Sequence, residues 1–248
     1  MEIRYETHQS RYLNRKMEYK IYGSKGLPCI LLPDENGRFY DWEEKGGLVD
    51  AAGRWIDAEK LVVFCPDSID AETFCAAGEE RTRAEQHERW ICYLTDEFLP
   101  CVQKACKNSA AAPLIAGCGL GAAHAVNLFL RRSELFCGVI GLGGLYDTGR
   151  FFAKTVDDLV FRNSPLLTLA SLPAADSRIA AWRKTSPFVL CCGQGDADAL
   201  QDTRKLADTL KKLEVPVWFD AWGTDVTHDW YWWNKQLNYF MEKAVFAE

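Results

Sequence analysis

The sequence lacks the residue patterns that build metal sites and disulfide frameworks. Its ten cysteines include no C-x-x-C pair, and its four histidines, at positions 8, 87, 124 and 228, are scattered. This spacing disfavours a structural zinc site. Most of the cysteines lie in or beside apolar strand-like runs, where free thiols behave as small hydrophobic side chains. A chain of this length needs no disulfide to fold, so we expect a reduced, cytoplasmic protein without a metal or other cofactor.

Long apolar runs and basic runs are also missing. No continuously apolar stretch approaches the roughly 20 residues that a membrane-spanning helix needs. Residues 1–6 are charged and lack the apolar core of a signal peptide. The net charge is −6 with both signs interspersed, which argues against a nucleic-acid surface. We therefore expect a small-molecule ligand rather than a membrane or nucleic-acid partner. A homodimer is expected only because such dimers are common.

What the sequence does contain is an alternation of strand-like and helix-like segments. Its 248 residues are 48% hydrophobic, enough to bury the core of one large α/β domain that spans 1–248. Residues 3–8 and 17–22 alternate in polarity around a polar link, which predicts an antiparallel hairpin at a sheet edge. Further strands are predicted at 29–33, 61–66, 113–116, 135–142, 187–193 and 215–222.

Helical periodicity fills the intervals between these strands. Segment 146–185 has weaker periodicity and is predicted to be an irregular, cap-like excursion. The alternation predicts a mostly parallel, doubly wound sheet with helices on both faces. The helices are expected at 41–53, 79–107 (kinked or divided at Pro100), 122–132, 199–213 and 229–246.

The most informative stretch is residues 113–124, PLIAGCGLGAAH. A short apolar run enters alternating glycines and leaves into an amphipathic segment, which predicts a strand, a tight turn and a helix. Two kinds of site use this arrangement. A dinucleotide-binding loop, G-x-G-x-x-G/A, fits Gly117, Gly119 and Ala122 as they stand. A hydrolase nucleophile elbow, G-x-S-x-G, requires a serine where this chain has Gly119.

The surroundings of the glycines favour the elbow. A dinucleotide loop usually follows the first strand of its domain, but here several strand-like runs come first. Two further polar loops follow predicted strands, GQGDAD at 193–198 and GTDVTHD at 223–229. The order elbow, acid, histidine is that of an α/β-hydrolase triad. His228 would be the base, with Asp196 and Asp198 competing for the acid role.

With these motifs the chain resembles the esterase-D-like branch of the α/β-hydrolases, known as the putative-esterase family. The resemblance covers nearly the whole chain. It includes GRFYDWE at 37–43, DSIDAE at 67–72, HERW at 87–90, the elbow followed by AAHA at 122–125, and HDW at 228–230.

The resemblance implies both a fold and a set of site residues. The fold is the α/β-hydrolase fold, and the reaction is cleavage of a carboxylic ester by a serine at position 119. Tyr40 lies inside one matching motif, and Trp230 opens an aromatic run, so both are expected to contact substrate. The other implied residues are Asp198 as the acid, His228 as the general base, and an oxyanion hole formed by the Leu120 N–H and the loop that begins at Asp34.

Gly119 departs from the family pattern at the nucleophile position. In the triad mechanism the serine oxygen attacks the carbonyl carbon and the histidine takes its proton, whereas glycine has no oxygen to supply. Cys118 is adjacent, but neighbouring residues at an elbow point in different directions, so we expect a buried thiol there. Glycine also relaxes the strained backbone of an elbow. The fold should therefore survive the loss of the serine.

The sequence thus predicts an esterase-like protein that is inactive or disabled in ester hydrolysis and keeps a pocket for an ester or acyl-like ligand. Two alternatives stay open: a non-catalytic ligand-binding or interaction protein on the same fold, and a dinucleotide-binding enzyme that uses Gly117, Gly119 and Ala122. Two other histidines are assigned structural roles. His124 is expected to pack behind the elbow, and the pair His87–Glu88 to lie on a helix surface or in a salt bridge.

Overall fold

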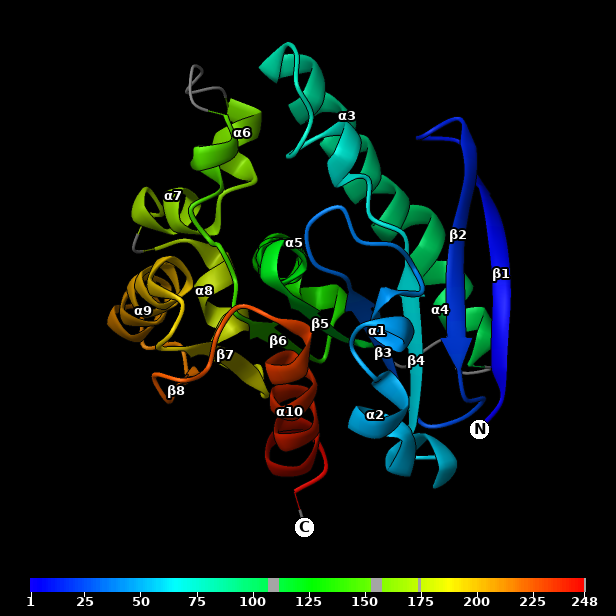
Figure 1. The fold of residues 1–248 in the computed structure, drawn as a ribbon. Helices are drawn as coiled ribbons and strands as arrows, with labels where there is room; N and C mark the ends of the chain where they lie inside the picture. The colour runs from blue at the N-terminus through cyan, green and yellow to red at the C-terminus, as the bar shows by residue number, and fades with distance from the viewer. Residues whose placement is uncertain (107–111, 153–157, 174, 248) are drawn as a thin grey trace.

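A computed structural model of the chain describes residues 1–106, 112–152, 158–173 and 175–247. These residues contain an eight-stranded sheet with the order β1-β2-β4-β3-β5-β6-β7-β8. In Figure 1 the sheet runs from the β1–β2 hairpin at the right to β8 at the left. The hairpin, β1 (Ile3–Ser10) and β2 (Arg15–Tyr22), is antiparallel and also meets β4 antiparallel, while the pairs from β4 to β8 are parallel. The predicted edge hairpin and mostly parallel sheet are confirmed.

The central strands are buried on both faces. Along β4, Val62 and Phe64 pack into one hydrophobic cluster, while Val63 and Cys65 pack into another on the opposite face. Because both faces are covered, these strands are continuous apolar runs rather than alternating ones. The remaining strands are β3 (Leu27–Leu32), β4 (Leu61–Pro66), β5 (Leu114–Cys118), β6 (Gly138–Leu142), β7 (Phe188–Gly193) and β8 (Trp218–Trp222).

Helices supply the other half of each cluster. One cluster contains buried residues of α3, α4, α5 and α9, and the other contains buried residues of α2 and α10. The helices on the two faces therefore close two cores around one sheet. Their bounds are α1 (Asp41–Glu44), α2 (Leu48–Asp57), α3 (Glu80–Cys92), α4 (Leu99–Ala105), α5 (Gly119–Arg131), α9 (Ala197–Lys212) and α10 (Trp230–Phe240).

Two predicted helices are divided in the structure. The predicted helix over 41–53 is wrong as a single element, because Gly47 has a left-handed φ of 57° and starts α2 as a separate helix. Only glycine adopts that conformation without strain. The predicted helix over 79–107 is α3, a π-helical stretch over Tyr93–Phe98, and α4. Pro100 lies in the first turn of α4, just after the π-helical stretch, and the backbone stays helical throughout 80–105. The division predicted at Pro100 is therefore a change of helix type before the proline and not a break in the helix.

The segment between β6 and β7 is more regular than its sequence suggested. Its described part contains a 3-10 turn (Thr148–Phe151), α6 (Asp158–Arg162), α7 (Pro165–Ala170) and α8 (Ser177–Trp182), and α7 packs against α9. Residues 153–157 and 174 of this predicted excursion lie outside the described residues. The organisation of 1–248 as a single domain stays a prediction.

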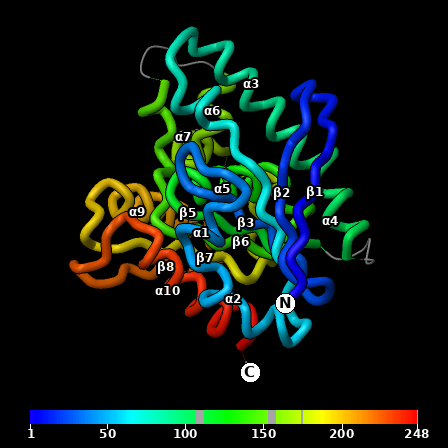
Figure 2. The backbone as a smooth tube through the Cα atoms, turned by 45° about the vertical axis from the view of Figure 1, so that its right-hand side comes forward, coloured from blue at the N-terminus to red at the C-terminus, as the bar shows by residue number. Residues whose placement is uncertain are grey.

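Both chain ends lie beside α2. Figures 1 and 2 show the N-terminus and the C-terminus at the same end of the molecule. The terminal ammonium of Met1 is 3.0 Å from Asp57, and Arg54 bonds to Glu242 near the other end. Within the described ranges, none of the helices has the length and apolarity needed to cross a membrane.

Candidate active site

Four loops at the carboxyl ends of parallel strands converge on one place. Asp34 follows β3, Gly119 follows β5, Asp196 follows β7 and His228 follows β8. In open α/β sheets, binding sites form at this edge because the loops of neighbouring strands meet there. The sequence prediction of three converging loops at Gly119, 193–198 and 223–229 therefore holds, and the loop at Asp34 joins them.

The glycine stretch folds as a strand, a sharp turn and a helix, as predicted. β5 ends at Cys118 and α5 begins at Gly119. Gly119 has a left-handed φ of 51°. A residue with a Cβ is strained in this region by about 1–3 kcal/mol. The backbone therefore makes the sharp strand-to-helix turn that is typical of a nucleophile elbow, and Gly119 has a hydrogen atom where other residues have a side chain.

The carboxylate of Asp34 occupies the place of that missing side chain. A Cβ built on residue 119 would overlap Oδ1 of Asp34 and would lie 3.1 Å from Nε2 of His228. The same Oδ1 accepts a hydrogen bond of 3.0 Å from the backbone N–H of Leu120. The loop at Asp34 was expected to contribute an N–H donor to an oxyanion hole. The loop also inserts an acceptor, the Asp34 carboxylate, which takes up the Leu120 N–H, and the backbone N–H of Glu35 in the same loop acts on that carboxylate as well. The oxyanion hole itself stays a prediction.

A tight turn holds Asp34 in this position. The N–H of Gly37 donates to the Asp34 carbonyl at 2.8 Å, and Asn36 has a left-handed φ of 54°. Asparagine tolerates that conformation better than most residues. The turn follows directly from β3, so the position of the carboxylate is set by the sheet.

Asp196, and not Asp198, is the carboxylate that contacts His228. Oδ2 of Asp196 lies 2.7 Å from Nδ1 of His228. Asp198 is 77% exposed and lies 3.7 Å from Arg150 instead. The resemblance implied that Asp198 is the acid beside His228, whereas in the structure the carboxylate beside His228 is that of Asp196. The reason is that Asp196 ends the strand loop and caps α9, whereas Asp198 already lies in the first helical turn.

Backbone hydrogen bonds fix the two loops that carry this pair. Gly195 N–H donates to the Val226 carbonyl at 3.0 Å, so the loops after β7 and β8 are tied together. The other oxygen of Asp196 accepts from the N–H of Ala199 at 3.0 Å and caps α9. One carboxylate thus anchors a helix with one oxygen and orients the imidazole with the other.

His228 lies between two carboxylates. Its Nε2 faces Asp34 Oδ1 at 3.8 Å, which is an ion-pair distance rather than a hydrogen bond. Burial lowers the pKa of His228, but the contact with Asp34 and the charges of Asp34 and Asp196 outweigh it and hold that pKa above its ordinary value. Burial likewise raises the pKa of Asp34, but the contact with His228 and the amides of Glu35 and Leu120 lower it overall. The three groups form a carboxylate–imidazole–carboxylate row, in which the carboxylates favour the protonated form of the imidazole.

The remaining predicted site residues lie around this row. Cys118 is fully buried, and burial raises the pKa of its thiol well above its ordinary value, so it is a packed side chain and not a thiolate. Trp233 packs edge-on against His228, with ring centroids 4.7 Å apart, and Trp230 packs on Trp233. Trp230 thus lies one ring away from the row. Tyr40 packs on Phe39 and beneath Arg38 instead.

Behind the elbow is a buried pair of histidines. His124 Nε2 lies 2.8 Å from Asp70 Oδ1, as fits its expected role as a packed residue. His87 was expected on a helix surface and is instead completely buried, while Glu88 forms the predicted salt bridge, with Arg131. The rings of His87 and His124 are 4.8 Å apart. Among the residues that the structure describes, neither ring nitrogen of His87 has a hydrogen-bond partner.

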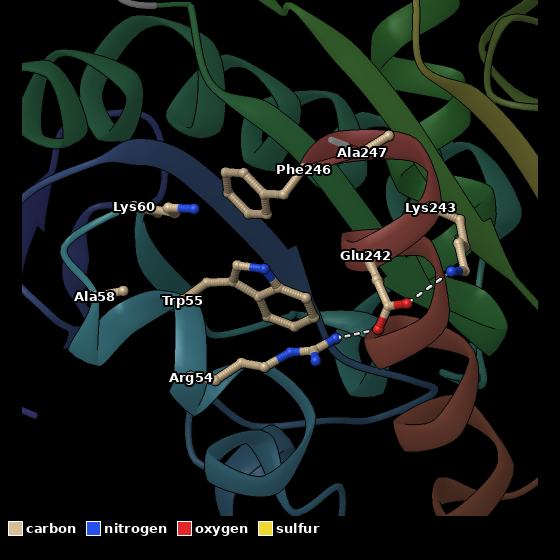
Figure 3. Close-up of a pocket in the computed structure, with 8 residues that line it drawn as sticks. All are labelled: Arg54, Trp55, Ala58, Lys60, Glu242, Lys243, Phe246 and Ala247. Carbon is tan, nitrogen blue, oxygen red and sulfur yellow. Dashed lines mark hydrogen bonds and ion pairs between the residues drawn. The ribbon is translucent and has the colours of Figure 1, made fainter.

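Figure 3 shows a cavity of about 600 Å³ away from this row, between the end of α2 and the C-terminal segment. It is next to Lys60, at the amino end of β4, so it opens at the opposite edge of the sheet. Its lining carries three cations, Arg54, Lys60 and Lys243, and one anion, Glu242, which bonds to Arg54 at 2.6 Å and pairs with Lys243 at 2.7 Å. In the described part of the chain, no three His, Cys, Asp or Glu side chains gather in an arrangement that could hold a metal ion.

Sequence reasoning missed the side chain of Asp34. It treated the loop only as a source of a backbone donor. Two features of the sequence could have revealed it. Asp34 comes directly after the predicted third strand, and Gly119 follows the strand that pairs with it in the sheet. β3 and β5 are adjacent parallel strands, with Leu32 opposite Gly117, so their two loops must meet.

The comparisons with known proteins bear on the family and the fold of the chain. The chain matches the model of the Putative esterase family over residues 10–242, and no curated protein matches it. Among solved structures, a ferulic acid esterase has a TM-score of 0.76 at 19% identity, over 96% of this chain and 95% of that one. An S-formylglutathione hydrolase from Agrobacterium tumefaciens has a TM-score of 0.71 at 15% identity, over 96% and 91%. A ferulic acid esterase from Anaeromyces mucronatus has 0.71 at 12%, over 98% and 90%.

These likenesses show that the fold is shared with esterases of the α/β-hydrolase type. The family match extends over most of the sequence, from the first hairpin to the last helix. The chain belongs to the Putative esterase family.

Proposed function

We propose that this chain is an esterase-family protein that does not hydrolyse carboxylic esters through an acyl-serine, and that keeps a ligand-accessible acid–base site. The observation that carries the proposal is the position of the Asp34 carboxylate, which fills the space of the side chain that Gly119 lacks. The base and its acid, His228 and Asp196, stand in the arrangement of a triad.

Two of the three parts that acyl transfer needs are compromised. A nucleophile must reach the carbonyl carbon, and donors must meet the developing oxyanion. At residue 119 there is no side chain, and the Leu120 N–H already bonds to Asp34. An ester carbonyl entering this hole would meet a carboxylate oxygen, which repels it. The third part, the base, is present.

The site is nevertheless open to a ligand. The side chains of Asp34 and His228 are 22% and 31% exposed. The ring of His228 packs on the buried Trp233 behind it, and Trp230 packs on Trp233. The solved neighbours named above are ferulic acid esterases and an S-formylglutathione hydrolase by name, so we propose a small ester-like or acyl-like molecule as the ligand class, held without turnover.

The test compares Gly119→Ser with the double variant Asp34→Ala, Gly119→Ser in the hydrolysis of p-nitrophenyl acetate. We expect the native chain to show no hydrolysis beyond that of His228→Ala. The single serine variant should stay low because its Cβ would overlap Asp34 Oδ1. The double variant should gain at least about 100-fold, since one oxyanion donor alone is worth about 10²–10³ in rate.

Two results would overturn the proposal. One is substantial hydrolysis by the native chain that His228→Ala abolishes. The other is a single serine variant that is as active as the double variant, because Asp34 would then not block the site. Thermal unfolding of each variant shows whether it is folded.

A further inference from the structure

We infer that this site opens epoxides: the carboxylate of Asp34 attacks a ring carbon, His228 protonates the ring oxygen, and the His228–Asp196 pair then directs water to release a vicinal diol. This inference goes beyond the proposed function and rests on the same vacancy at Gly119. It assigns a chemical use to the carboxylate that has replaced the serine.

Asp34 has the position and the state of a nucleophile. Its carboxylate stands where the serine side chain of an elbow would stand, and it is partly exposed. Carboxylates act as nucleophiles in enzymes when they are held in place and ionised. The Leu120 amide and the turn at Gly37 hold this one. Its pKa lies below its ordinary value, so it is ionised at neutral pH.

The state of His228 selects the substrate class. An ester that reacts with a hydroxyl needs a base in its first step, and an alkyl halide needs no proton at all. An epoxide needs an acid first, because the opened ring leaves an alkoxide. His228 lies between Asp34 and Asp196, at 3.8 and 2.7 Å, and two carboxylates favour its protonated form. The resting site therefore offers a carboxylate and an acid together.

The first step balances with these groups alone. A new bond forms between an Asp34 oxygen and the ring carbon as the carbon–oxygen bond of the epoxide breaks. The ring oxygen takes the proton of His228. The products are a hydroxyalkyl ester of Asp34 and a neutral imidazole.

The second step restores the resting site. Neutral His228, oriented by Asp196, takes a proton from water, and the hydroxide adds to the carboxyl carbon of Asp34. The oxygen that bonds to the Leu120 N–H then carries the negative charge, in a ready-made oxyanion site. The tetrahedral adduct collapses by breaking the ester bond between the Asp34 carboxyl carbon and the alkoxide oxygen, and the leaving alkoxide takes the proton of the added hydroxyl group. The diol leaves, and both the Asp34 carboxylate and protonated His228 are regenerated.

The distances suit one small ring. Reacting atoms in a bound complex lie about 3–3.5 Å apart, and proton transfer needs about 2.6–3.2 Å. A ring wedged against Asp34 and His228, whose nearest atoms are 3.8 Å apart, can meet both limits because its carbon and oxygen are adjacent. Trp233 is buried edge-on behind His228 and holds the imidazole in place.

The experiment uses the full chain and styrene oxide, with formation of phenylethanediol measured by chromatography. We expect turnover by the native chain and a loss of at least about 100-fold in Asp34→Asn, since the nucleophile is removed. Asp198→Asn is the matched control, because it makes the same change at an exposed carboxylate outside the site, and it should keep the native rate. Unfolding curves of both variants show that each is folded.

A single turnover in ¹⁸O-water with protein in excess tests the covalent step. The diol should be unlabelled, and the peptide that contains Asp34 should carry the label. A labelled diol, or equal rates in the native chain and Asp34→Asn, would overturn the inference. So would the absence of both diol and peptide label in the folded native chain. If these fail while the double serine variant gains ester hydrolysis, the proposed function stands without this inference.

Discussion

Asp34 and Gly119 exclude one another's side chains: any Cβ on residue 119 would overlap Oδ1 of Asp34. The two residues lie 85 positions apart in sequence, yet β3 and β5 are neighbours in the sheet and bring them together. The Asp34 carboxylate therefore fits in its position because residue 119 is a glycine and leaves that space free.

This exclusion predicts energetic coupling between the two positions. Gly119→Ala should destabilise the chain through two effects: strain at its left-handed φ, about 1–3 kcal/mol, and overpacking against Asp34, about 1–3 kcal/mol. In the Asp34→Ala background only the strain remains, so the same substitution should cost less there. Urea unfolding of the four proteins measures the difference. Additive effects, within about 0.5 kcal/mol, would contradict the overlap.

The pairing of Asp196 with His228 predicts a selective shift in titration. Asp196→Asn keeps an oxygen that can cap α9 but removes the negative charge beside Nδ1. The pKa of His228 should therefore fall, as followed by NMR of the imidazole protons. Asp198→Asn is the control, because that carboxylate lies near Arg150 and not near His228. A fall in Asp198→Asn alone would restore the implied assignment.

Most of the fold could be predicted because its signals are local. Buried parallel strands are continuous apolar runs, and the glycine stretch at 113–124 marks a strand, turn and helix. The division at Gly47 was missed because the apolar spacing on either side of it reads as one helix. Its left-handed φ depends on how α1 and α2 pack, which no short window of sequence contains.

The site was predicted less completely, since it depends on which side chains meet across loops. The choice between Asp196 and Asp198 turns on where the strand loop ends and α9 begins, a boundary that sequence periodicity leaves uncertain by a few residues. The burial of His87 depends on the helix face that meets Phe74 and His124. The insertion of Asp34 depends on the order of the strands.

The ion pair of Asp34 and His228 predicts a window of pH in which it stabilises the fold. The pKa of His228 is raised, so its contribution is complete below its ordinary pKa of about 6.5 and is lost as pH rises through the raised value. The pKa of Asp34 is lowered, so its contribution is complete above about 3.9 and is lost as pH falls through the lowered value. The pair stabilises most between those limits.

Asp34→Asn should therefore lower stability most between about pH 4 and 6.5, and the difference from the native chain should shrink at alkaline pH. The urea unfolding midpoints of the two proteins, compared across this range and at alkaline pH, measure the difference in stability. A difference that grows with pH would contradict the ion pair. Asp198→Asn again serves as the control.

His87 predicts an opposite dependence on pH. Burial lowers the pKa of His87 well below its ordinary value, and the neighbouring His124 and Arg131 lower it further. The folded chain therefore keeps this imidazole neutral, whereas the unfolded chain binds a proton below about pH 6.5. Stability from this residue should fall as pH decreases through that value.

Replacing His87 with leucine tests this directly, because leucine has a similar volume and no polar atoms. Both imidazole nitrogens lack hydrogen-bond partners within the described part of the chain, and an unsatisfied buried polar group costs about 1–3 kcal/mol. His87→Leu should thus be neutral or more stable at pH 7, and its unfolding midpoint should decline less between pH 7 and 5 than that of the native chain. His8→Gln, at a partly exposed histidine, is the control. A His87→Leu variant that is much less stable at both pH values would mean that the imidazole makes a bond essential to the core behind the elbow.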